Sequence, residues 1–204
     1  MGSVKTIDVM IDDVTPLDRV MQLLQTCSNL KVFTIRLSLQ QYVYDYSERL
    51  EVVDLSCCLT LKSLTVRLIG AEWAASETSE EIQGMVSALV SILRTTPPSL
   101  RTLTIELSTP HLQDEQQRSW ILHQLPSTLQ HFTGLESFTF VVISCTDDAW
   151  DGEENIHVRG GAQVEGTDYT CVSGEGVIAV IQEELKNLFD NAPIRVEAGT
   201  VEFY

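Results

Sequence analysis

Leu61–Leu68 reads LKSLTVRL, and the chain repeats this stretch closely enough to decide its fold. Large apolar residues occupy its first, fourth, sixth and eighth positions. The pattern returns at 4–11 (VKTIDVMI), 30–37 (LKVFTIRL), 100–107 (LRTLTIEL) and 135–142 (LESFTFVV). The five copies begin 26, 31, 39 and 35 residues apart, and self-similarity at such periods is typical of repeat proteins.

Each copy is predicted to be a β-strand with one buried face. Apolar positions four, six and eight alternate with positions five and seven, and β-branched and aromatic residues are frequent. The alternating positions are mostly polar: Asp8, Thr34, Thr65, Thr104 and Thr139 at position five, and Met10, Arg36, Arg67, Glu106 and Val141 at position seven. One face of the sheet is therefore expected to contact water.

Between the copies the apolar period changes to about 3.6 residues, which predicts helices. They begin at Thr15-Pro16, at the capping box Thr78–Glu81, at Asp114 and at Gly176, and the second of them stops at Pro97-Pro98. Their inward residues are Leu17, Val20, Met21 and Leu24; Ile82, Met85, Val86, Leu89 and Leu93; Trp120 and Ile121; and Ile178, Ile181, Leu185, Leu188 and Phe189. The third and fourth helices are expected to end at Leu125 and Asp190.

Two parts of the chain are less regular. The sequence allows two readings of the connection Leu39–Thr60. Tyr42, Tyr44 and Tyr46 alternate like a strand, while residues 50–55 fit a short helix. After the last helix, Ile194–Val196 and Thr200–Phe203 predict one or two closing strands.

Alternating strands and helices imply parallel strands joined by right-handed crossovers, for which two closures exist. A doubly wound sheet has helices on both faces and strands that are continuously apolar, whereas a solenoid has helices on one face. Because positions five and seven are polar, the pattern favours an α/β solenoid with a mainly parallel sheet.

The pattern Leu-x-x-Leu-x-Leu, with Cys-x-x-Leu-Lys at Cys27–Lys31 and Cys58–Lys62, resembles the strand segment of leucine-rich repeats of the F-box-associated and fungal type. The resemblance covers residues 4–145. It implies a curved sheet with helices on the convex face. The asparagine expected after each strand is replaced by Ser38, Ile69, Ser108 and Ile143, so the repeats are degenerate. No F-box-like segment precedes the first copy, so a role as an adaptor in ubiquitin ligation is not implied.

One domain is expected, with repeated units over 1–143, an irregular acidic and glycine-rich loop over 144–176, and a final helix with closing strands over 177–204. In the loop, alignment of Asp147 with the first ligand of an EF-hand places Ala149 and Val158 at ligand positions, so that template fails. A mobile acidic loop, a metal site and a partner-binding arm remain as readings, of which the first is favoured.

The chain has a formal net charge of −16, from 13 Lys and Arg against 29 Asp and Glu. Such a charge disfavours nucleic acid and anionic membranes as partners, because both are bound through basic side chains. No stretch has the length of a membrane span or the form of a signal peptide, so a cytoplasmic or nuclear protein is expected rather than a secreted one.

Five cysteines exclude a complete disulfide framework. Cys27 and Cys58 stand three residues before a copy, where Pro97 and Phe132 stand in later units, so a buried apolar slot is predicted. A bridge between Cys145 and Cys171 is a second possibility, which an intracellular setting disfavours.

No catalytic motif, phosphate loop, metal-ligand spacing or cofactor motif is present, so no catalytic residue, metal or cofactor is predicted. His123 and His131 are expected to be solvated or to cap a helix end. A non-catalytic module that binds a protein partner through the exposed strand face is favoured. Its candidate contact residues are Thr34, Arg36, Thr65, Arg67, Thr104, Glu106 and Thr139. For Arg36 and Arg67 the alternatives are contact with an acidic group of the partner and pairing across strands.

The alternative function is an α/β enzyme or small-molecule binder with its site at the carboxyl ends of the strands, under the 144–176 loop. It predicts a deep pocket near Ser38, Ile69, Ser108 and Cys145.

Overall fold

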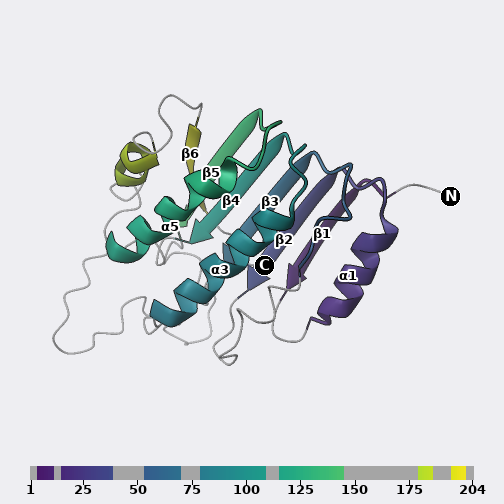
Figure 1. Cartoon of the computed structure of the whole chain (residues 1–204). Helices are drawn as coiled ribbons and strands as arrows, with labels where there is room; N and C mark the ends of the chain where they lie inside the picture. The colour runs from purple at the N-terminus through teal and green to yellow at the C-terminus, as the bar shows by residue number, and fades with distance from the viewer. Residues whose placement is uncertain are drawn as a thin grey trace.

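The fold is that of a computed structural model of the chain, which describes residues 4–11, 15–38, 53–69, 79–108, 115–144, 179–185 and 194–200. Six strands form one parallel sheet in the order of the chain (Figure 1). They are β1 (Thr6–Ile11), β2 (Val32–Ser38), β3 (Ser63–Ile69), β4 (Thr102–Ser108), β5 (Ser137–Ser144) and β6 (Ile194–Thr200). The predicted α/β class with a parallel sheet is confirmed, and one closing strand is present in the described C-terminal part.

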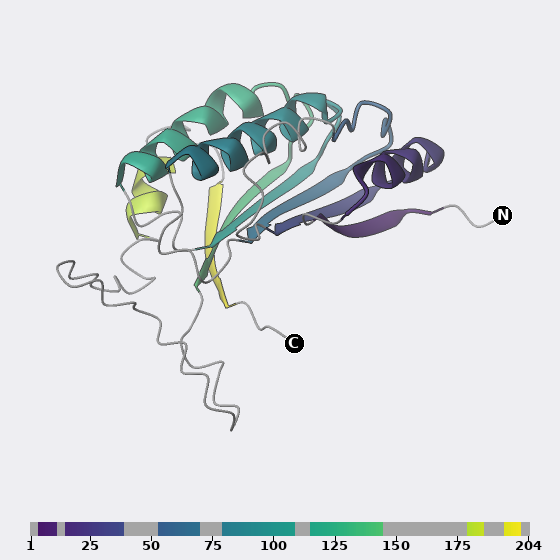
Figure 2. The same ribbon diagram turned by 90° about the horizontal axis from the view of Figure 1, so that it is seen from below.

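The helices α1 (Leu17–Thr26), α3 (Ser79–Thr95) and α5 (Glu115–Leu129) cover the same face of the sheet (Figure 2). This arrangement follows from the strand order, because right-handed crossovers that always step in one direction place every helix on one side. Residues 179–185 form a further helical segment whose Ile181 and Leu185 are buried, as expected.

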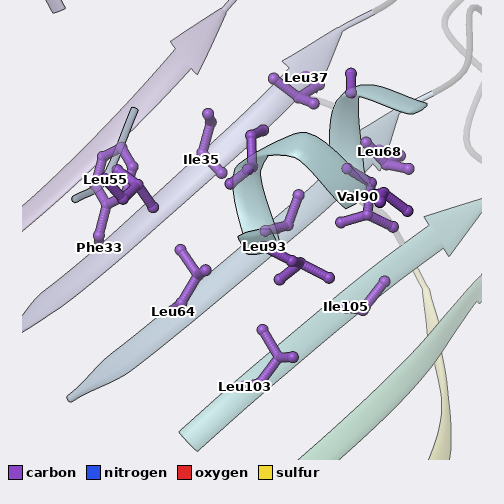
Figure 3. Close-up of a cluster of buried hydrophobic side chains, with 14 of the residues drawn as sticks. Phe33, Ile35, Leu37, Leu55, Leu64, Leu68, Val90, Leu93, Leu103 and Ile105 are labelled. Atoms are coloured by element: carbon purple, nitrogen blue, oxygen red, sulfur yellow. The ribbon is translucent and has the colours of Figure 1, made fainter. Parts of the chain in front are cut away.

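The core lies between the sheet and the helices (Figure 3). Position six of the interior strands, held by Ile35, Val66, Ile105 and Phe140, is 0% exposed. From the helix layer, Val90 and Leu93 of α3 face these strands, and Leu55 belongs to the same buried cluster as Phe33. The alternation read from the sequence therefore matches the buried face of each strand.

The strands begin later than the copies that predicted them. Each of the strands β1 to β5 starts at the third position of its copy, because the second position belongs to the turn. The amides of Lys31 and Val32, for example, both bond to the carbonyl of Lys5 at 2.9 and 3.0 Å. The regular ladder begins only after this shared acceptor, and the same arrangement recurs at Lys62-Ser63, Arg101-Thr102 and Glu136-Ser137.

Two helix predictions were wrong at their ends. The cap of α1 is Pro16 rather than Thr15, whose hydroxyl instead donates to the carbonyl of Met10 at 3.3 Å. Helix α5 continues through Pro126 to Leu129 instead of ending at Leu125. Leu125 and Leu129 lie four residues apart on its buried side, so burial of the last turn outweighs the bond that proline cannot donate.

Residues 53–55 contain no helix, so the short-helix reading of 50–55 fails for its described part. Val53 and Leu55 are nevertheless fully buried. The Leu55 amide donates to the Thr95 hydroxyl at 3.1 Å, which ties this segment to the end of α3. The other predictions for 39–52, the capping box at Thr78 and the side chains of Ile82, Met85 and Trp120 lie outside the described parts of the structure.

The predicted apolar slot before each strand is confirmed. Cys27, Cys58, Pro97 and Phe132 are all buried, and each precedes a turn that leads into its strand. In the first three of these turns the amide of the leucine three residues later bonds back to the slot residue. Leu30 bonds to Cys27 at 3.0 Å, Leu61 to Cys58 at 2.9 Å and Leu100 to Pro97 at 3.1 Å. A residue in this slot therefore closes the turn and fills the core at once.

Candidate functional site

The face of the sheet opposite the helices is called the open face, and positions five and seven line it. The strand register places Thr34, Thr65, Thr104 and Thr139 side by side, with Asp8 continuing this column on β1. Position seven forms the next column, made of Met10, Arg36, Arg67, Glu106 and Val141. None of the described helices lies on this face (Figure 2).

The predicted contact residues are therefore brought together. Thr34, Thr65, Thr104 and Thr139 are half-buried, which fits side chains standing between neighbours on a sheet rather than under another layer. A continuous threonine column supplies hydroxyl donors and acceptors at the strand spacing of about 4.8 Å. The threonine column itself is therefore polar but uncharged.

The charged residues of the open face pair with one another across strands. Arg36 Nη2 lies 2.5 Å from Asp8 Oδ2 on the neighbouring strand, and both side chains are nearly half exposed. Arg67 Nε pairs with Glu106 Oε2 on β4, and the Glu106 side chain is only 13% exposed. Of the two roles considered for Arg36 and Arg67, pairing across strands is present in the free chain.

Arg36 keeps one unsatisfied donor. Its Nε atom is buried and has no hydrogen-bond acceptor among the described residues, although its Nη2 is paired with Asp8. A buried donor without an acceptor costs about 1–3 kcal/mol. This cost belongs to the folded chain itself, because the buried Nε atom is not accessible from the surface.

A second set of polar residues was missed by the sequence interpretation. The second position of four successive copies is basic, and we call Lys5, Lys31, Lys62 and Arg101 the basic row. Backbone bonds connect its members from strand to strand, because the amides of Lys31, Lys62 and Arg101 each bond to the carbonyl of the preceding member. The row could be recognised from the sequence as a basic residue recurring at the second position of four copies, but this position lies outside the alternating positions within the strands.

The basic row lies at the amino ends of the strands. Glu136 occupies the equivalent position before β5, and its Oε1 lies 3.0 Å from Arg101 Nη1. The side chains of Lys5 and Lys31 are exposed and that of Lys62 is half-buried. Within the described parts of the chain, the three lysines have no carboxylate partner.

Of the cysteines that the structure describes, Cys58 has a poorly reactive thiol. Cys27, Cys57 and Cys58 are free thiols, and the Sγ atoms of Cys57 and Cys58 lie 3.8 Å apart. Burial, with a smaller contribution from the neighbouring Cys57 thiol, raises the pKa of the Cys58 thiol from 9.0 to about 12. A thiol with this pKa is protonated at neutral pH and is a poor nucleophile and metal ligand.

Two histidines form hydrogen bonds with backbone carbonyls, one beyond the end of α3 and one within α5. His131 Nε2 lies 3.0 Å from the Thr96 carbonyl, just beyond the end of α3, and His123 Nδ1 lies 2.6 Å from the Ser119 carbonyl one turn earlier in α5. Both contacts fit the expected solvated or capping role. Among the described residues, no group of three or more His, Cys, Asp or Glu side chains is placed to hold a metal ion.

The residues of the alternative enzyme site lie mostly outside the described structure. The backbones of Ser38, Ile69 and Ser108 end their strands, but their side chains, Cys145 and most of the 144–176 loop are not described. The Cys145–Cys171 bridge and the readings of the acidic loop fall in the same segment. None of the described helices combines the length and apolar character that crossing a membrane requires.

Comparison with protein-family models, with curated proteins and with solved structures gives no match for the chain.

Proposed function

We propose that this chain is a non-catalytic protein-interaction module of the leucine-rich-repeat type, whose open face binds a protein partner. The observation that carries the proposal is the threonine column at Thr34, Thr65, Thr104 and Thr139, which none of the described helices covers. Repeat solenoids bind extended partners on the face that their strand positions line. Sequential parallel strands, helices on one side and a repeated slot before each strand support a solenoid of this type.

The charges of the open face support recognition of a polar partner. Two cross-strand ion pairs hold Arg36 and Arg67 in place, so a partner would meet ordered groups instead of freely moving ones. Ordering before contact lowers the entropy that binding must overcome.

The test compares two pairs of matched substitutions in an affinity capture from the native source, quantified by mass spectrometry. Thr65→Arg with Thr104→Arg adds two bulky cations to the open face. Gln22→Arg with Ser87→Arg adds the same charge to exposed positions of α1 and α3. Circular dichroism first checks that both variants fold.

The proposal predicts a protein that the unmodified chain and the helix-layer variant retain, and that the open-face variant loses. A protein lost only with the helix-layer variant would contradict the proposal. The proposal would also be contradicted if the unmodified chain retained no protein above the background of bare resin. Calorimetry with the purified partner then measures Arg36→Ala with Arg67→Ala, for which unchanged affinity would remove these two residues from the contact.

A further inference from the structure

The basic row is a cluster of positive charges in a chain whose composition is strongly acidic. Thirteen Lys and Arg are set against 29 Asp and Glu, yet four of the thirteen stand in neighbouring positions at one end of the sheet. The turns beside them, residues 27–29, 58–60, 97–99 and 132–134, contain no acidic residue. This end of the sheet is therefore locally positive on a strongly negative protein.

Such an arrangement is unfavourable in the free chain. Neighbouring parallel strands lie about 4.8 Å apart, and like charges directly opposite on adjacent strands are destabilising. Lys5, Lys31 and Lys62 repel one another, and no carboxylate among the described residues compensates them. Asp54, which precedes the turn before β3, accepts the Ser56 amide at 2.8 Å. An added anion would relieve the repulsion.

The chain itself indicates which anion fits. Glu136 continues the row on the next unit and its carboxylate pairs with Arg101 at 3.0 Å, so one member of the row already binds a carboxylate. The other three members offer ammonium groups at the same relative position. Lysine ammonium groups on flexible stems can adjust to carboxylates at different spacings.

We propose that the basic row binds a carboxylate-rich segment of a protein partner, with Lys31 and Lys62 at the centre of the contact. A nucleic acid fits less well, because its long phosphate backbone would also meet the field of a chain whose net charge is −16. A short acidic segment meets chiefly the row, since charges further than about 8 Å are screened at physiological salt.

The row stands apart from the open-face threonines, so this proposal and the proposed function can fail independently. Binding is measured by fluorescence anisotropy with a labelled octa-glutamate peptide, with octa-glutamine as the neutral control. The row variant is Lys31→Gln with Lys62→Gln. Lys31→Gln alone is matched to Arg19→Gln, which removes one exposed positive charge near the start of α1, where the strands end rather than begin.

Octa-glutamate is expected to bind, to bind more weakly as salt rises, and to lose between about two-fold and thirty-fold in affinity in the double variant. Arg19→Gln is expected to change the affinity by less than about 1.5-fold, on the basis that surface charges far from a contact contribute little. Amide chemical shifts of residues 31, 62 and 101 should move on titration, which places the peptide on the row.

Three results would overturn the proposal. The first is the absence of octa-glutamate binding, or equal binding of octa-glutamine. The second is an equal loss in Lys31→Gln and Arg19→Gln. The third is tighter binding of a single-stranded DNA octamer that depends on Lys31 and Lys62, which would assign the row to nucleic acid. Far-UV circular dichroism of the variants, which change only exposed or half-buried side chains, checks that they remain folded.

Discussion

The two faces of β3 differ completely although they come from alternating residues of one short stretch. Leu64, Val66 and Leu68 are 0% exposed beneath the helices, whereas Thr65 and Arg67 stand half-buried on the open face. Most all-parallel sheets are covered on both faces and have continuously apolar strands. Here a period of two within each strand, combined with one direction of crossover, produces a parallel sheet whose second face is polar.

The contrast between the two faces of β3 is tested most strongly by truncating adjacent side chains that point to opposite faces. Leu64→Ala should lower the free energy of unfolding by about 2–5 kcal/mol, because it leaves a cavity between sheet and helices. Thr65→Ala should change it by about 0.5 kcal/mol or less, as expected for a position outside the core. Urea unfolding followed by circular dichroism measures both, and equal costs would mean that the open face is also packed.

Cys57 and Cys58 repeat the contrast in adjacent residues, one exposed and one buried. At pH 8 iodoacetamide should modify Cys57 readily and Cys58 only on unfolding, as peptide mapping by mass spectrometry would detect. The raised pKa of Cys58 also predicts a pH effect. Below pH 9 the thiol is protonated in both states, and between pH 9 and about 12 only the unfolded state ionises.

The free energy of unfolding should therefore fall as pH rises through this window. Cys58→Ala should remove that part of the fall, and Cys57→Ala is the control. If both variants show the same slope against pH as the unmodified chain, Cys58 is not protected by burial in the folded state.

The two ion pairs allow a finer comparison within the open face. Arg67→Met should cost about 1–3 kcal/mol, because it leaves the poorly exposed Glu106 carboxylate without its partner. Arg36→Met should cost at most about 1 kcal/mol, since Asp8 is nearly half exposed. Double-mutant cycles with Glu106→Gln and Asp8→Asn give the coupling energies. A larger coupling for the exposed pair would contradict this ranking.

The smallest expected difference compares the edge of the sheet with its interior. Val9 in β1 is only partly buried, while Val66 at the same strand position in β3 is 0% exposed. The same change to Ala should therefore cost more at Val66, by on the order of 1 kcal/mol. Thermal unfolding of the two variants measures the difference. Equal destabilisation would indicate that the edge of β1 is covered.

Periodicity sufficed for the strands, for most of the buried strand positions and for the slot that holds Cys27 and Cys58, because burial acts on the repeats in a similar way. The first apolar position was less reliable, since Val4 is 48% exposed. Rules based on residue type alone predicted the ends of the helices less well. Thr15 was a plausible cap by residue type, but its hydroxyl bonds to Met10, and Pro126 was a plausible stop that the burial of Leu129 overrides. A cap or a stop depends on the tertiary surroundings of one residue.

The candidate site was predictable in composition but not in its contacts. The threonine column followed from position five, whereas the pairing of Arg67 with Glu106 required the strand register. The basic row was readable at position two and became meaningful only once backbone bonds joined its members. The identity of a partner depends on a second molecule, so no pattern within this chain specifies it.

The central claim is that the sheet is covered on one face and open on the other, and cysteine scanning along β4 tests it most directly. Leu103, Thr104, Ile105, Glu106 and Leu107 are replaced singly by Cys, and maleimide labelling of each new thiol is followed by peptide mapping. The account predicts alternation, with faster labelling at 104 and 106 than at the buried positions 103, 105 and 107. Protection at all five positions would contradict it, because both faces of the sheet would then be covered.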